Sequence, residues 1–143
     1  MNTKHVPNLE LCQELDRLCK EKNITLPETE FYWVEATISG EWYLASNADN
    51  HYSPATKGFF PAPLVSEQGE WLPNELGGDY GGVLTCTVTN NEAWDVTYWS
   101  FFREKEASQM KNAETFQFLS STEANARQKM LNYLIAEGII TKL

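Results

Sequence analysis

The chain has few of the residues on which most catalytic and metal-binding sites depend. Its 143 residues include two histidines, His5 and His51, and three cysteines without a Cys-x-x-Cys pair. An odd number of cysteines at such spacings does not make a disulfide framework or a zinc knuckle. Nucleophilic catalysis needs a base beside a serine or cysteine, and two histidines offer little choice of one. We therefore expect no enzyme activity, no metal and no cofactor.

Long apolar runs are also lacking. A membrane-spanning helix needs roughly 18 or more consecutive apolar residues, and the chain has no such run. Its first residues, MNTKHVPNLELCQEL, do not place an apolar stretch after a basic one, as a secretory signal does. We expect a cytoplasmic protein that does not associate with membranes.

Basic residues are scarce in the middle of the chain. The net charge is −9, and residues 35–95 hold nine acidic residues against one basic residue, Lys57. Such a segment repels phosphate backbones and attracts basic partners or cations. Direct binding of nucleic acid is therefore not expected, whereas contact with a basic protein is compatible with this charge.

The apolar and charged residues, which are abundant, predict helices at both ends of the chain. Apolar residues recur at helical spacing over residues 8–22, with charged residues elsewhere on the helix. Asn8 suits the start of this helix as a cap, and Asn23 suits its end because asparagine tolerates a left-handed backbone. The predicted helix therefore buries one face.

The second terminal helix is predicted over about residues 122–137. Ser120 and Glu123 stand at the spacing of a capping box, and Gly138 can end the helix in a left-handed conformation. A short third helix is predicted near residues 64–72, where apolar residues again fall at helical spacing.

Alternating residues predict five strands. Residues 30–38 and 41–46 form a hairpin around a Ser-Gly turn, and residues 82–89 and 93–102 form a second one. A fifth strand is predicted near residues 114–120. Short turns make neighbouring strands antiparallel.

These elements predict an α+β fold. We expect one antiparallel sheet of about five strands, with the N-terminal and C-terminal amphipathic helices packed on one face. Residues 1–143 are predicted to form a single globular domain, in which residues 47–81 are a long and mostly irregular segment.

The second face of the predicted sheet combines aromatic and polar side chains. Alternation assigns Tyr32, Val34, Ala36 and Ile38 to the core face. The candidate binding residues on the opposite face are Phe31, Trp33, Glu35, Tyr43, Asp95, Trp99 and Phe101. An exposed patch of this kind marks an oligomer, partner or ligand interface, unless aromatic residues of the segment 47–81 cover it.

A resemblance to known proteins rests on three stretches of the sequence: ETEFYWV, PAPL followed by EWLP, and TEANARQKMLNYLIAEGII. They resemble small uncharacterised proteins encoded in phage and prophage genomes of bacteria, and together they cover about a quarter of the chain. The resemblance implies an origin in a bacterial mobile element. It brings no assigned activity and no binding residue.

Three functions remain open at this point. We expect a non-enzymatic accessory protein of phage or prophage type, which acts by contact with a partner protein or by self-association. The alternative is an acidic decoy that imitates nucleic acid and occupies a basic DNA-binding protein. A third possibility is an enzyme or sugar-binding module in which aromatic rings stack on the ligand and Glu35 or Asp95 serves as acid or base.

Overall fold

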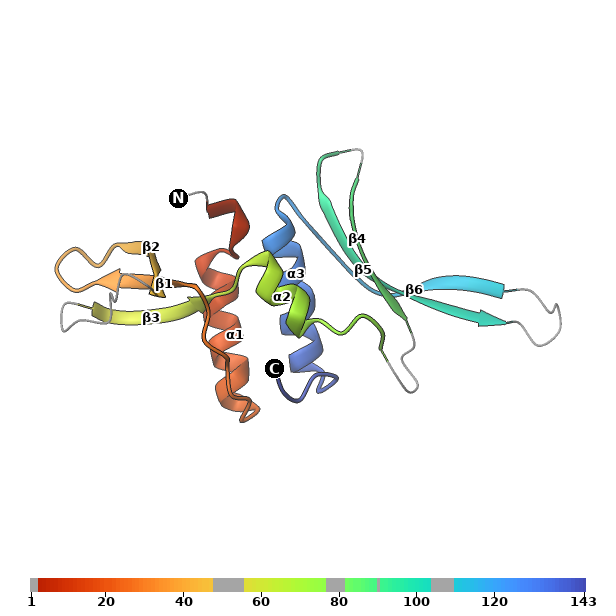
Figure 1. The fold of residues 1–143 in the computed structure, drawn as a ribbon, viewed down its shortest axis with the longest axis horizontal. Helices are drawn as coiled ribbons and strands as arrows, with labels where there is room; N and C mark the ends of the chain where they lie inside the picture. Colours follow the sequence, from red (N-terminus) through yellow and green to blue (C-terminus); the bar gives the residue numbers. More distant parts are fainter. Residues whose placement is uncertain (1–2, 48–55, 77–81, 90, 104–109) are drawn as a thin grey trace.

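The computed structural model describes residues 3–47, 56–76, 82–89, 91–103 and 110–143. Its elements are, in chain order, a 3-10 turn η1 (Thr3–His5), α1 (Leu9–Glu21), β1 (Phe31–Ala36), β2 (Trp42–Ser46), β3 (Thr56–Ala62), α2 (Val65–Trp71), β4 (Val83–Val88), β5 (Trp94–Arg103), β6 (Met110–Ser120) and α3 (Glu123–Ala136). Figure 1 shows the helices as a central layer with one sheet on each side. The fold is α+β.

The first predicted helix is confirmed as α1. The side-chain oxygen of Asn8 accepts a hydrogen bond from the N–H of Leu11 at 3.0 Å, which satisfies one of the unpaired donors at the start of the helix. Asn23 follows the helix with a φ of 57°, in the left-handed region. The apolar face of α1 buries Cys12, Leu15, Leu18 and Cys19.

The last helix is confirmed as α3, but its predicted cap is wrong. Thr122 is the N-cap, and its hydroxyl oxygen accepts from the N–H of Asn125 at 3.2 Å. Ser120 cannot cap the helix because β6 continues through it. Gly138 follows the helix with a φ of 73°, as predicted.

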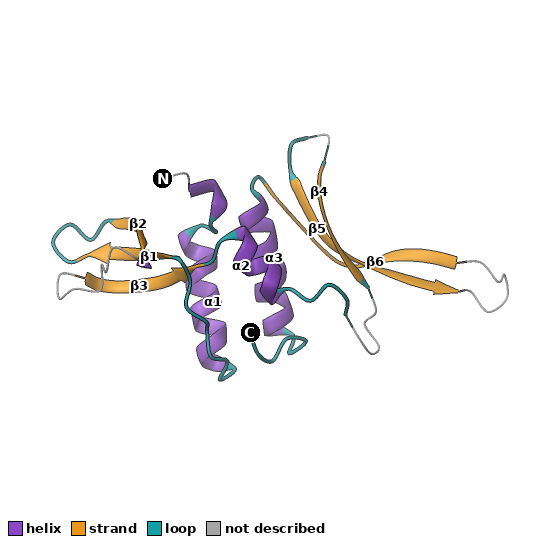
Figure 2. Cartoon of the chain, viewed as in Figure 1, coloured by secondary structure: helices purple, strands orange, loops and turns teal. Residues whose placement is uncertain are grey.

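The strands form two three-stranded antiparallel sheets, with the orders β2-β1-β3 and β4-β5-β6 (Figure 2). A single sheet of about five strands was expected, and the difference arises from β3, which the sequence did not indicate. Because β2 and β3 pair with the two edges of β1, the second hairpin has no place beside β1. The segment 47–81 therefore contains a strand as well as the predicted short helix, α2.

The helices pack between the sheets rather than together on one face. α3 covers the second sheet, where Val96 and Tyr98 lie in one buried cluster with Met130 and Leu134. α1 contacts both α3 and β3 of the first sheet. Ile38, which alternation assigned to the core, is fully exposed because β1 ends at Ala36 and the chain turns there.

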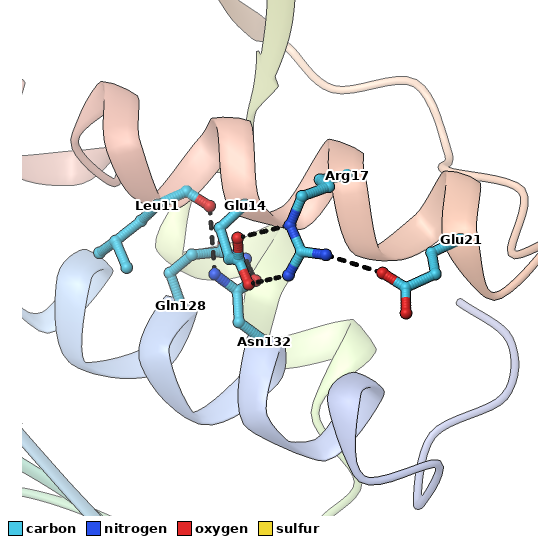
Figure 3. A network of polar contacts seen from close by, with 6 residues as sticks. All are labelled: Leu11, Glu14, Arg17, Glu21, Gln128 and Asn132. Atoms are coloured by element: carbon cyan, nitrogen blue, oxygen red, sulfur yellow. Dashed lines mark hydrogen bonds and ion pairs between the residues drawn. The ribbon is translucent and has the colours of Figure 1, made fainter.

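A chain of buried amides joins the three helices. Gln68 of α2 donates from Nε2 to the carbonyl oxygen of Ala124 and to Oε1 of Gln128, both at 3.0 Å. Gln128 donates to Oδ1 of Asn132 at 2.8 Å, and Asn132 donates to the carbonyl oxygen of Leu11 in α1 at 3.1 Å (Figure 3). Each bond replaces water lost on burial, so the chain fixes how the helices sit against one another.

Within the residues that the structure describes, no helix combines the length and the apolar content needed to cross a membrane.

Candidate functional site

Two of the predicted binding residues lie on a covered face of the first sheet. Phe31 and Trp33 pack against a buried cluster that includes Val6 and Cys12. The indole N–H of Trp33 also donates to the carbonyl oxygen of Pro7 at 2.9 Å. The N-terminal segment and α1 therefore cover this face, and it is not an open aromatic patch.

Glu35 and Tyr43 lie on different faces of the same sheet. Phe31, Trp33 and Glu35 are alternate residues of β1 and therefore share one face. Glu35 pairs with Trp42 of β2 and is partly buried. Tyr43 pairs with Val34 on the opposite face and is 40% exposed. Phe59 lies on that face too and is 50% exposed, whereas Tyr32, Val34 and Ala45 of the same face form a buried cluster.

Asp95 and Trp99 lie on the outer face of the second sheet, away from α3. The hydroxyl of Thr97 donates to one carboxylate oxygen of Asp95, and the amide of Gln117 donates to the other at 2.7 Å. The indole N–H of Trp99 donates to the hydroxyl oxygen of Thr85 at 3.0 Å. The polar side chains on this face therefore form hydrogen bonds with one another.

The predicted residues do not form one surface. Phe31, Trp33, Glu35 and Tyr43 belong to the first sheet, and Asp95 and Trp99 belong to the second, beyond the helices (Figure 2). The backbone of Phe101 lies in β5, but its side chain falls outside the described residues. Because Glu35 and Asp95 are on separate sheets, the structure does not assemble them as an acid–base pair.

The cysteines are poorly suited to nucleophilic chemistry. Burial raises the pKa of the Cys12 thiol, and burial raises the pKa of Cys19 to about 11. Burial also raises the pKa of Cys86. A thiol that stays protonated at neutral pH is a weak nucleophile and a poor metal ligand. In the described ranges, no three His, Cys, Asp or Glu side chains gather in a group that could hold a metal ion.

Two adjoining hollows are lined by residues of η1 and of the segment that begins α3. Figure 1 shows these two segments at one end of the helical layer. The larger, of about 500 Å³, is lined by Lys4, His5, Val65, Trp94, Ser121, Thr122 and Glu123. The smaller, of about 210 Å³, is lined by Thr3, Lys4, Val6, Asn8, Trp33, Thr122 and Asn125. Lys4 and Thr122 belong to both hollows, which together we call the α3 groove.

The two hollows extend from the shared residues toward different sheets. Trp94 and Val65, in the larger hollow, come from the second sheet and α2. Trp33 in the smaller hollow comes from the first sheet, and Val6 comes from the segment between η1 and α1. Each hollow therefore offers an indole and a β-branched apolar side chain, with polar groups between them.

Most side-chain acceptors in the α3 groove are already used. Oδ1 of Asn8 accepts from Leu11, and Oδ1 of Asn125 accepts from the N–H of Asn8 at 2.8 Å. The carboxylate of Glu123 pairs with the guanidinium of Arg127 at 2.7 Å, and both side chains are mostly buried. The amide NH₂ of Asn125, by contrast, has no partner within the described chain. The groove therefore favours a ligand that accepts hydrogen bonds.

Sequence reasoning missed the α3 groove. Its lining comes from η1, β1, α2, β5 and α3, and no local pattern shows that these segments meet. One signal was available. Lys4 and His5 are adjacent in a chain of net charge −9, and they stand directly before a helix that Asn8 caps.

Comparisons of the chain with protein families, with curated proteins and with solved structures find no match. The resemblance to phage and prophage proteins therefore stays a prediction.

Proposed function

We propose that this chain is a non-enzymatic protein that binds a segment of a partner protein in the α3 groove. The observation that carries the proposal is the pair of adjoining hollows, each with its own tryptophan and both sharing Lys4 and Thr122. Extended peptides are recognised by successive pockets that accept separate side chains. Tryptophan is also among the side chains that contribute most at interfaces.

The surroundings of the candidate catalytic groups favour a binding role over catalysis. Asp95 is held by Thr97 and Gln117, and Cys12 is buried with a raised pKa. The resemblance noted above leads us to propose that the protein is an accessory protein of phage or prophage type that works in the bacterial cytoplasm.

The acidic decoy has less support. A decoy needs carboxylates arranged along one surface. The acidic residues of the middle segment that lie in helices or strands of the described chain are instead spread over separate elements, with Glu35 in β1, Glu67 and Glu70 in α2, and Asp95 in β5. Glu67 is also engaged, because its carboxylate accepts from the N–H groups of Leu64 and Glu30 at 2.7 and 3.0 Å. No single surface of the described chain favours this function over peptide binding.

The test is affinity capture from a bacterial lysate with the wild type and two variants, at low and at moderate salt. Ser121→Trp places an indole at an exposed position that lines the larger hollow. Thr25→Trp adds the same side chain at an exposed position beyond the other end of α1 and serves as the matched control.

The proposal predicts a partner that the wild type and Thr25→Trp retain and that Ser121→Trp loses while it remains folded. Retention by Ser121→Trp would contradict it. Loss from every form on adding salt would instead favour the acidic decoy, because screening weakens exposed charge contacts.

A further inference from the structure

One edge of the second sheet is formed by β4, and half of this edge is open within the described chain. We infer that two copies of the protein associate through these half-edges, so that β4 of one copy lies antiparallel to β4 of the other. The residues that line the α3 groove do not come from β4, so the inference goes beyond the proposed function.

The open part of the edge follows from one hydrogen bond. The N–H of Leu84 donates to the carbonyl oxygen of Asn74 at 2.9 Å, on the side of β4 away from β5. Backbone groups of alternate strand residues point to the same side, so those of Cys86 and Val88 also point away from β5. The segment at Asn74 meets β4 only through an isolated bridge at the start of the strand, and no described strand pairs with the edge at Cys86 and Val88. Figure 1 shows this end of β4 extending beyond the helical layer.

β4 lacks the features that protect an open edge. Its sequence, VLTCTV, contains no charged residue and no proline, which are common on exposed edge strands. At the opposite edge of the sheet, the ammonium of Lys129 donates to the carbonyl oxygen of Leu119 in β6 at 3.2 Å. Val88 is 55% exposed, although it alternates onto the face of Leu84 and Cys86, which pack against the core. The edge therefore favours pairing with another strand.

The occupied half of the edge fixes the register. A two-fold axis at Thr87 places Cys86 opposite Val88 of the second copy, and the reverse pair forms by symmetry. Each pair exchanges two backbone hydrogen bonds, which makes four in all. An axis at Cys86 would instead set Val88 against Leu84, whose N–H already donates to Asn74. The pairing is therefore centred on Thr87.

The side chains are compatible with this register. On the inner face, Cys86 meets the exposed Val88 of the second copy, and the symmetric contact repeats this apolar pair. On the outer face, the two Thr87 side chains meet at the axis, and pairs of threonines stabilise neighbouring strands. A second copy therefore supplies the apolar and hydroxyl groups that each face of this edge favours.

Net charge opposes association, but the distance between the nearest sheet carboxylates limits its effect. Each copy carries −9. Asp95 faces Thr87 across the pairing of β4 with β5, so the two copies of Asp95 are three strand spacings apart, about 14 Å. This exceeds the Debye length of about 8 Å at physiological salt. The dimer is therefore expected to tighten as salt screens the remaining repulsion.

Sedimentation equilibrium of the full chain at low and moderate salt tests the inference with two variants. Val88→Pro removes an N–H that points away from β5, so the pairing within the sheet is kept. Thr87→Lys sets two ammonium groups beside each other at the axis, from a position that is exposed in one copy.

Each variant has a matched control in β6. Leu119 faces Asp95, whose backbone groups are directed to β4, so Leu119→Pro also removes an N–H that points away from β5. Gln117→Lys adds an ammonium at an exposed position on the same outer face as Thr87.

The wild type and both controls should form a dimer whose dissociation constant falls as salt is added. Val88→Pro loses two of the four hydrogen bonds, and Thr87→Lys opposes two like charges. Each should raise the dissociation constant about tenfold while the protein remains folded by circular dichroism.

Cross-linking tests the register if the proline variant does not fold. The Cα atoms of facing residues at the axis lie about 4.5 Å apart, which a disulfide can span. Oxidised glutathione, which takes up the two electrons and two protons released, should therefore join two copies of Thr87→Cys. It should leave Gln117→Cys and the wild type as single chains on a denaturing gel.

A wild type that stays monomeric over the whole concentration range would overturn the inference. A dimer that Val88→Pro and Thr87→Lys form with unchanged affinity would do the same, as would cross-linking of Thr87→Cys no faster than that of Gln117→Cys. None of these results bears on the α3 groove, which the capture experiment with Ser121→Trp tests separately.

Discussion

The indole N–H of Trp33 donates a hydrogen bond to the carbonyl oxygen of Pro7 at 2.9 Å. This bond fastens the N-terminal segment to the first sheet. Lys4 and Val6 lie just before Pro7, and both line the α3 groove beside Trp33. The contact therefore holds one wall of the groove in place.

Trp33→Phe tests this relationship. The substitution keeps an aromatic ring but leaves the carbonyl of Pro7 with only the weak thiol donor of Cys12 at 3.7 Å, so we expect a loss of about 1 kcal/mol in the free energy of unfolding. Amide exchange at Val6, whose N–H donates to Thr3, should become faster. Urea denaturation and hydrogen exchange measure the two effects.

Trp42→Phe is the control, since Trp42 lies on the same face of the sheet and its ring contacts Phe60. It should leave amide exchange at Val6 unchanged. Equal acceleration in both variants would mean that ring packing, and not the bond to Pro7, holds the segment.

The chain of buried amides predicts that two similar substitutions lower the free energy of unfolding by different amounts. Gln128→Leu removes a partner from Gln68 and from Asn132, so it should destabilise the protein by about 2 to 3 kcal/mol. Gln68→Leu also removes two bonds, to Gln128 and to the carbonyl of Ala124, but it eliminates a buried Oε1 that has no hydrogen-bond partner among the described residues. Its cost in urea denaturation should be about half as large. Equal costs would show that the bonds do not couple the helices as described.

The buried thiols predict that the stability of the protein depends on pH in the alkaline range. Burial raises the pKa of Cys19 to about 11 and raises the pKa of Cys12, so the folded protein holds protons that the unfolded chain releases near pH 8.5. Stability from these thiols is present below that pH and is lost as the pH rises through the folded pKa values. The Tm should therefore fall between pH 8.5 and 10.5.

The variant Cys12→Ala should show a shallower fall in Tm over this range, measured against its own value at pH 7. Iodoacetamide at pH 8 should label Cys86, which is partly exposed, before Cys12, which is fully buried. Faster labelling of Cys12 than of Cys86 would contradict the burial on which the pH prediction depends.

The outer face of the second sheet predicts a coupling between Asp95 and Thr97. Asp95→Ala leaves the buried hydroxyl of Thr97 without its acceptor, so we expect a loss of about 1 to 2 kcal/mol. In the background of Thr97→Val, the same substitution should cost less, because no hydroxyl remains to be satisfied. Additive losses in this double-mutant cycle would contradict a direct interaction.

The local elements of the fold were predictable because their signals are local. The apolar spacing of α1, the cap at Asn8, the left-handed Asn23 and the stop at Gly138 each involve residues a few positions apart. The two hairpins follow from alternation around short turns in the same way. Their positions in the structure agree with the sequence to within a few residues.

The pairing of strands was not predictable in this way. β3 contains Gly58 and Pro61, which weaken a strand signal, and it becomes a strand because it pairs with β1. Alternation separates Phe31 and Trp33 from Tyr32 and Val34 correctly, but it does not show which face the N-terminal segment and α1 will cover. The α3 groove depends on the same long-range contacts.

The most direct test of the account is an NMR titration that follows the indole N–H signals of the tryptophans as the partner segment obtained by affinity capture is added. The account predicts that the signals of Trp33 and Trp94 shift together and saturate, because these indoles line the two hollows. The signals of Trp42 and Trp99, which lie outside the groove lining, should stay in place. A shift of Trp99 with Trp33 and Trp94 unchanged would contradict the account and move the binding surface to the outer face of the second sheet.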